Sequence, residues 1–182
     1  MPVSWENCPT DTRVQVEGVI TGCQAALGDD LTAVYLYGSL AMGCFNPALS
    51  DVNLMLVTAQ PLSAPQSDAL AQAVHALDGQ PHALDVTVIE QAQLDPWQHP
   101  PTAAWRSQAA WHTDTDLTAR LVMARERGIA LLGEPLYTLL PDVPSEDFID
   151  GLLNIFDSVQ GKLQQQPVNS VLTMCRVCWY LA

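Results

Sequence analysis

The stretch YLYGSLAMGCFNPALSDVNLMLV, residues 35–57, decides the fold. Two apolar runs rich in Val, Leu and Tyr flank a polar turn, which predicts two strands joined by a short loop. Gly38 has no Cβ, so the backbone there can approach a ligand closely, and Ser39 adds a hydroxyl and N–H groups of the kind that bind phosphate. Asp51 and Asn53 are two residues apart, so both side chains leave the same face of the second strand, where a metal bound to the same phosphates would lie.

The surrounding sequence predicts an α+β fold. Apolar periodicity indicates a helix, two strands, a helix and a third strand in turn, at residues ~10–27, 32–37, 52–58, 66–77 and 82–89. This order favours a mixed sheet with helices packed on one side. Four more helices are expected, at ~104–111, 114–128, 145–163 and 168–181, with a loop over 130–144.

Asp85 is unusual because it lies in the apolar run ALDVTVI, residues 83–89, where a central strand should be hydrophobic. Burying an unpaired charge is costly, so a metal, a cationic partner or a raised pKa is expected there. The alternative is an aspartate on a solvent-facing side, or one that is hydrogen-bonded to nearby backbone.

Charge and composition exclude some classes of partner. The net charge is −13, with seven basic residues of which only one is Lys, so the clustered cations that bind a phosphate backbone are missing. An acidic surface suits a polycationic small substrate, although solubility alone would also explain it. The chain has no apolar run near the ~20 residues of a membrane helix and no visible secretory signal, so a cytoplasmic protein without membrane contact is expected.

The five cysteines are scattered, which favours reduced thiols. Cys175 and Cys178 form a CxxC within an apolar helical run, where core packing is the expected role, because no second CxxC is present to complete a metal site. Trp97, Trp105 and Trp111 are expected in the core, and His82 and His112 on the surface or in packing roles.

Residues 35–57 resemble the signature of the polymerase-β-like nucleotidyltransferases. Four further stretches, at 83–89, 95–101, 112–135 and 169–182, are similar to the streptomycin/spectinomycin adenylyltransferases, the aminoglycoside 3″ and 9 group. The resemblance implies a nucleotidyltransferase domain at 1–111 and part of a helical domain at 112–182. The apolar last helix ends without a capping signal, so the expectation is a fragment, a shortened variant, or self-association through that helix.

The resemblance also implies an activity: Mg²⁺-dependent transfer of AMP from ATP to a hydroxyl of a cationic antibiotic, an aminoglycoside or spectinomycin. Metal ligands would be Asp51, Asn53 and Asp85, with Asp85 also the general base for the acceptor hydroxyl. The resemblance assigns the nucleotide phosphates to Gly38, Ser39, Ser50 and Arg176. Ser50 has an alternative role as a strand-start cap, and Arg176 as a surface or helix-end arginine.

Two positions depart from the family pattern. Asn53 stands where a second acid is usual and removes one negative charge, so weaker metal binding is expected; Asp85 stands where Glu is usual and reaches one methylene less far. Two other hypotheses therefore stay open: a catalytically inactive nucleotide-binding or scaffolding protein, and a nucleotidyltransferase that modifies a protein.

Overall fold

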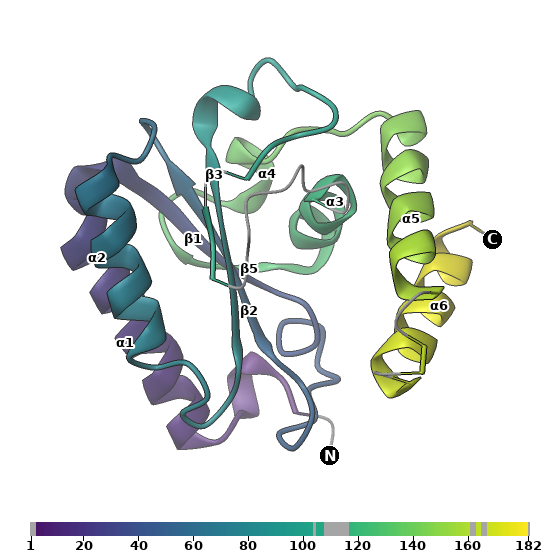
Figure 1. Cartoon of the computed structure of the whole chain (residues 1–182), viewed down its shortest axis with the longest axis horizontal. Coiled ribbons are helices and arrows are strands. Elements are labelled where there is room, and N and C mark those ends of the chain that lie inside the picture. Colours follow the sequence, from purple (N-terminus) through teal and green to yellow (C-terminus); the bar gives the residue numbers. More distant parts are fainter. Residues whose placement is uncertain (1–2, 104, 108–116, 161–162, 165–166, 182) are drawn as a thin grey trace.

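A mixed sheet organises the chain (Figure 1). The computed structural model describes residues 3–103, 105–107, 117–160, 163–164 and 167–181. Within these ranges five strands form one sheet in the order β4-β3-β2-β1-β5. The strands are β1 Leu31–Tyr37, β2 Val52–Thr58, β3 Leu84–Glu90, β4 Trp105–Arg106 and β5 Ile129–Leu132. The α+β fold with a mixed sheet, predicted from the sequence, is confirmed.

The strand directions follow from the connections. β1 and β2 are joined by a short loop and pair antiparallel, whereas β2 and β3 are joined through helix α2 (Ala64–His75) and pair parallel. β4 pairs antiparallel with β3 at one edge, and β5 pairs antiparallel with β1 at the other. The central strands β1, β2 and β3 carry apolar side chains on both faces, so both faces must be covered.

Helices cover the two faces of the sheet. Helix α1 (Thr10–Leu27) and α2 pack on one face, against alternate residues such as Leu36 and Leu54. Helix α3 (Leu117–Arg127) and the single turn α4 (Leu136–Leu139) pack on the other face, against Tyr35 and Met55. The two helices of the first half of the chain thus lie on one side of the sheet, as predicted, and helices of the second half cover the other face. The short 3₁₀ turns are η1 Trp5–Asn7, η2 Gly28–Asp30 and η3 Gln91–Gln93.

The C-terminal helices α5 (Ser145–Gln160) and α6 (Pro167–Leu181) form a hairpin that lies beyond α3, away from the sheet (Figure 1). Leu152 of α5 and Val177 of α6 are buried in one cluster with residues of α3. The loop after β3 is tied to the same hairpin, because Trp97 Nε1 donates to Asp147 Oδ2 at 2.8 Å. Within the described residues no helix is long and apolar enough to cross a membrane.

Two segments differ from the sequence prediction. Residues 105–106 form a strand and residue 107 a turn instead of a helix, and the other residues of the expected helix, 104 and 108–111, lie outside the described residues. β5 occupies part of the expected loop over 130–144. The domain boundary expected at residue 111, and with it Trp111, His112 and Asp114, also lies outside the described residues. Beyond that point α3 and β5 still belong to the sheet and its covering layer.

Cys175 and Cys178 are exposed on α6, so the prediction that they pack in the core is wrong. Val177, between them in the sequence, is buried in the cluster that α6 shares with α3. Only a narrow stripe of α6 meets that cluster, so the two cysteines remain exposed. His82 has the predicted packing role: it is buried, contacts Phe45 edge to face and lies 2.8 Å from Thr12 Oγ1. Trp97 and Trp105 are half-buried at the edges of the two main clusters.

Candidate active site

Asn53 and Asp85 are brought together by the parallel pairing of β2 with β3, in which they are direct register partners. Asp51 precedes β2 and lies two residues before Asn53, on the same side of the chain. All three side chains belong to the face that α3 covers, together with Tyr37, which pairs with Asn53 across β1 and β2. The structure thus places Asn53 beside Asp85, with Asp51 two residues away, while the roles expected for these residues remain predictions.

Gly38 forms the turn at the end of β1, directly beside Asn53. Its φ is +74°, in the region that glycine adopts without strain, and a Cβ built on it would lie 2.8 Å from Asn53 Oδ1. The loop that follows is closed by main-chain bonds, from Met42 N to Gly38 O at 3.0 Å and from Cys44 N to Ser39 O at 2.9 Å. Only glycine leaves room at this position for the Asn53 amide.

Asp51 and Asn53 are linked to one another, because Asn53 Nδ2 donates to the main-chain oxygen of Asp51 at 3.2 Å. The amide oxygen of Asn53 is thereby turned toward Gly38. Partial burial raises the pKa of the Asp51 carboxyl, and the nearby carboxylates of Asp85 and Asp78 raise it further. A cation at this place would relieve the same repulsion.

Ser50 is engaged in the preceding loop. Its Oγ accepts from Asn46 N at 3.1 Å, and its own N–H donates to Asn46 O at 2.8 Å. Both bonds lie within the loop before β2, and the two roles expected for Ser50 remain predictions.

Asp85 is paired with two arginines that the sequence reasoning missed. Arg120 Nη1 of α3 donates to Asp85 Oδ2 at 2.9 Å, and Arg106 Nη2 of β4 lies 3.6 Å from Asp85 Oδ1. Arg120 Nη1 also lies 3.4 Å from the hydroxyl of Tyr37, whose pKa is raised chiefly by burial. The cationic partner expected for this buried carboxylate therefore comes from within the chain. No local pattern could have revealed it, because both contacts join distant segments.

The oxygen atoms at the site suit one divalent cation. The Asp51 carboxylate and the Asn53 carbonyl are hard oxygen donors, and Mg²⁺ commonly takes one or two such ligands while keeping water and substrate phosphates. Both oxygens of Asp85 face guanidinium groups. Among the described residues no group of three His, Cys, Asp or Glu side chains is arranged to hold a metal.

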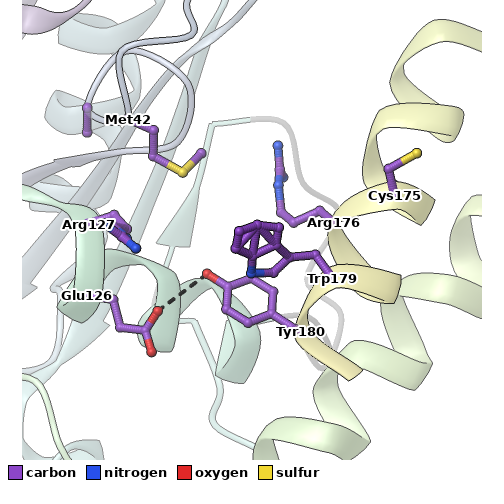
Figure 2. A pocket seen from close by; sticks show the side chains of 8 residues that line it. Met42, Glu126, Arg127, Cys175, Arg176, Trp179 and Tyr180 are labelled. Atoms are coloured by element: carbon purple, nitrogen blue, oxygen red, sulfur yellow. Dashed lines mark hydrogen bonds between the residues drawn. The ribbon is translucent and has the colours of Figure 1, made fainter. Parts of the chain in front are cut away.

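Arg176 lies in a separate pocket between the loop after β1 and the C-terminal hairpin (Figure 2). This cavity of about 570 Å³ is lined by Ala41, Met42, Glu126, Arg127, Cys175, Arg176, Trp179 and Tyr180. The hydroxyl of Tyr180 lies 3.5 Å from Glu126 Oε2, and burial followed by that carboxylate raises the pKa of Tyr180. The pocket therefore combines two arginines with an aromatic wall from α6, beside the loop that follows the Gly38-Ser39 turn.

A mixed sheet with a Gly-Ser turn after one strand and polar oxygen ligands on the next two is the arrangement of a nucleotidyltransferase fold. In agreement, the chain superimposes with a TM-score of 0.82 on the crystal structure of the spectinomycin adenyltransferase AAD(9) from Enterococcus faecialis with ATP and spectinomycin. That match covers 93% of this chain and 75% of the other, at 23% identity.

Sequence comparisons find relatives with named activities. Residues 138–182 match the model of the aminoglycoside adenylyltransferase C-terminal domain. The spectinomycin 9-adenylyltransferase of Enterococcus faecalis is 24% identical over 92% of this chain and 72% of its own length. The aminoglycoside (3″)(9) adenylyltransferase of Klebsiella pneumoniae is 27% identical over 92% of this chain and 71% of its own length. These comparisons agree with the resemblance found in the sequence: the chain is similar to the aminoglycoside and spectinomycin adenylyltransferases.

Proposed function

We propose that this protein transfers AMP from ATP to a hydroxyl of an aminoglycoside or of spectinomycin and releases pyrophosphate. The observation that carries the proposal is the register of β2 and β3, which places Asn53 opposite Asp85 beside the Gly38 turn. The relatives named above support the class of acceptor.

The chain's own groups divide between holding ATP and preparing the acceptor. Asp51 and Asn53 would hold one Mg²⁺, which when bound neutralises charge on the phosphates and keeps them in place. The N–H groups of the Gly38-Ser39 turn, which lies beside Asn53, would bind phosphate oxygens. Arg176 would reach the phosphates from the pocket beside α6.

Asp85 would act on the acceptor. The hydroxyl oxygen of the drug forms a bond to the α-phosphorus, the bond from that phosphorus to the pyrophosphate breaks, and the hydroxyl proton passes to the Asp85 carboxylate. Arg120 and Arg106 hold this carboxylate in place before the substrate arrives. Such prior orientation is a large part of what a catalytic group contributes.

The charge of the chain suits the proposed acceptor. A net charge of −13 attracts polycationic molecules and raises their concentration near the surface. Trp179 and Tyr180 give the pocket an aromatic wall, on which a cationic or ring-shaped ligand can pack.

Asn53 weakens the proposed metal site. An amide oxygen carries no net charge, so the site holds Mg²⁺ with one charge fewer than a pair of carboxylates would give. We therefore expect slow turnover that Asn53→Asp increases.

The test is adenylylation in vitro with ATP and Mg²⁺, and streptomycin or spectinomycin as acceptor, for the natural chain and for Asn53→Asp. Release of pyrophosphate together with a drug–AMP product identified by mass supports the proposal. Calorimetry with ATP and Mg²⁺ is run beside it. ATP binding without turnover in either version favours the inactive nucleotide-binding hypothesis, and absence of ATP binding contradicts both.

A further inference from the structure

Asp85 has a different arginine at each of its two carboxylate oxygens. Arg120 approaches Oδ2 from α3 at 2.9 Å, and Arg106 approaches Oδ1 from the edge strand β4 at 3.6 Å. The side chains of Asp85, Arg106 and Arg120 are 17%, 21% and 19% exposed, so the cluster is shielded but stays close to solvent. Elements on two sides of Asp85 therefore supply its counter-ions.

The arginines change the charge that a metal ion would meet. Asp51 and Asp85 provide two negative charges, Asn53 provides none, and Arg106 and Arg120 provide two positive charges. The formal charges of these five side chains cancel, and the nearby Asp78 carboxylate leaves an excess of only one negative charge, whereas Mg²⁺ and Ca²⁺ sites are built from carboxylate and carbonyl oxygens. Guanidinium groups stay protonated at any pH at which the protein is folded, so the two positive charges are permanent.

The geometry also limits which groups can bind a metal. A carboxylate whose two oxygens face guanidinium groups has to give up at least one of these ion pairs before it can coordinate a cation. Among the described residues no arginine pairs with the Asp51 carboxylate, which instead experiences repulsion from Asp85 and Asp78. The groups of this cluster that can bind a metal are therefore the Asp51 carboxylate and the Asn53 carbonyl.

We propose that Arg106 and Arg120 are positioning residues that serve as permanent counter-ions of Asp85. Their ion pairs keep Asp85 from binding a metal, so that the site binds a cation at Asp51 alone. This inference rests on the proposed function for the role of the metal. The two arginines provide at Asp85 the positive charge that a second divalent cation would otherwise provide. Asp85 is thereby kept oriented for the acceptor at the cost of metal affinity.

The experiment measures Mn²⁺ binding to the full chain without nucleotide or drug, from the electron paramagnetic resonance signal of free Mn²⁺. Arg120→Gln removes one positive charge, and we expect Mn²⁺ to bind about tenfold more tightly, as one unit charge at a partly buried site implies. Arg120→Lys retains the charge and is expected to bind Mn²⁺ within about twofold of the natural chain. Arg125→Gln is the matched control, because Arg125 lies on the same helix but pairs with Asp142 and Leu140 O.

A merely structural ion pair would give a different result. Loss of a structural pair loosens the site and leaves Mn²⁺ affinity unchanged or lower in both Arg120 variants. If Arg120→Gln does not fold, by circular dichroism, Arg106→Gln removes the same charge from the other side and is expected to show the same increase. Unchanged or weaker Mn²⁺ binding in the folded Gln variant, or an equal increase in Arg120→Lys, overturns the proposal. Failure of adenylylation in the enzyme assay would contradict the proposed function without altering this measurement.

Discussion

Asn53→Asp tests the site through stability as well as through activity. In the natural chain the Asn53 amide donates to Asp51 O at 3.2 Å, and an aspartate cannot make this bond. Its loss costs about 1 kcal/mol. A third carboxylate beside Asp51 and Asp85 adds repulsion of about 1 kcal/mol at a partly exposed position. We therefore expect the free energy of unfolding to fall by about 2 kcal/mol without metal.

The expected loss of unfolding free energy corresponds to a measurable decrease in Tm. For a chain of 182 residues, 1 kcal/mol corresponds to a change of about 2–4 °C in Tm, so Asn53→Asp should melt about 4–8 °C lower in EDTA. Mg²⁺ should reverse the loss, because the variant binds it with an additional negative charge. At a Mg²⁺ concentration about one hundred times Kd, binding adds about 2.7 kcal/mol to stability, which exceeds the expected loss.

The assay is differential scanning calorimetry of both versions in EDTA and in a Mg²⁺ series. Asn154→Asp is the control, since Asn154 Nδ2 donates to Asp150 Oδ2 at 3.2 Å on α5, outside the site. Asn154→Asp should lose stability and regain none with Mg²⁺ beyond what the natural chain gains. The reasoning is refuted if Asn53→Asp melts like the natural chain in EDTA, or if Mg²⁺ raises both Tm values equally.

Three further outcomes are expected. Gly133→Ala should lower Tm by at least about 4 °C in a thermal melt. The φ of Gly133 is +82°, and a Cβ at this position would overlap Thr32 O. A Tm within 1 °C of the natural chain would contradict the close approach of β5 to β1. Burial raises the pKa of the Cys23 thiol to about 12, so a colorimetric disulfide reagent at pH 8 should label the exposed cysteines and reach Cys23 only after unfolding. Asp51→Asn should raise Tm in EDTA at pH 7, because the folded-state pKa of Asp51 is raised and its ionised form destabilises the fold. That gain should disappear as the pH falls below the ordinary carboxyl range, and a gain independent of pH would exclude a charge effect.

Local pattern was sufficient for the parts of the site that lie on regular strands. The strands predicted at 52–58 and 82–89 contain Asn53 and Asp85, and the helix predicted between them is the crossover that their parallel pairing requires. Gly38 was predicted in a turn between two apolar runs, and the structure has that turn, with a φ of +74° at Gly38. These are short-range rules, and they hold here without knowledge of the rest of the chain.

Contacts between distant segments could not be predicted in the same way. Arg120 and Arg106 are 35 and 21 residues from Asp85, and each looks like an ordinary arginine in its own segment. β5 was missed because IALL is only four residues long and becomes a strand by pairing with β1. Cys175 and Cys178 were misplaced because the apolar content of α6 does not show which face meets α3.

The candidate phosphate turn and the acid-bearing strands are contained in residues 38–85, while the pocket wall formed by Trp179 and Tyr180 comes almost a hundred residues later. The two parts meet through packing of α6 on α3 and across the pocket that α6 shares with the loop after β1. Under the proposed function, changes at Trp179 or Tyr180 would alter which molecule is admitted while Asp51, Asn53 and Asp85 stay in place. In an evolving population, such a division would let selection by a new drug act on the aromatic wall without putting the metal and acceptor groups at risk.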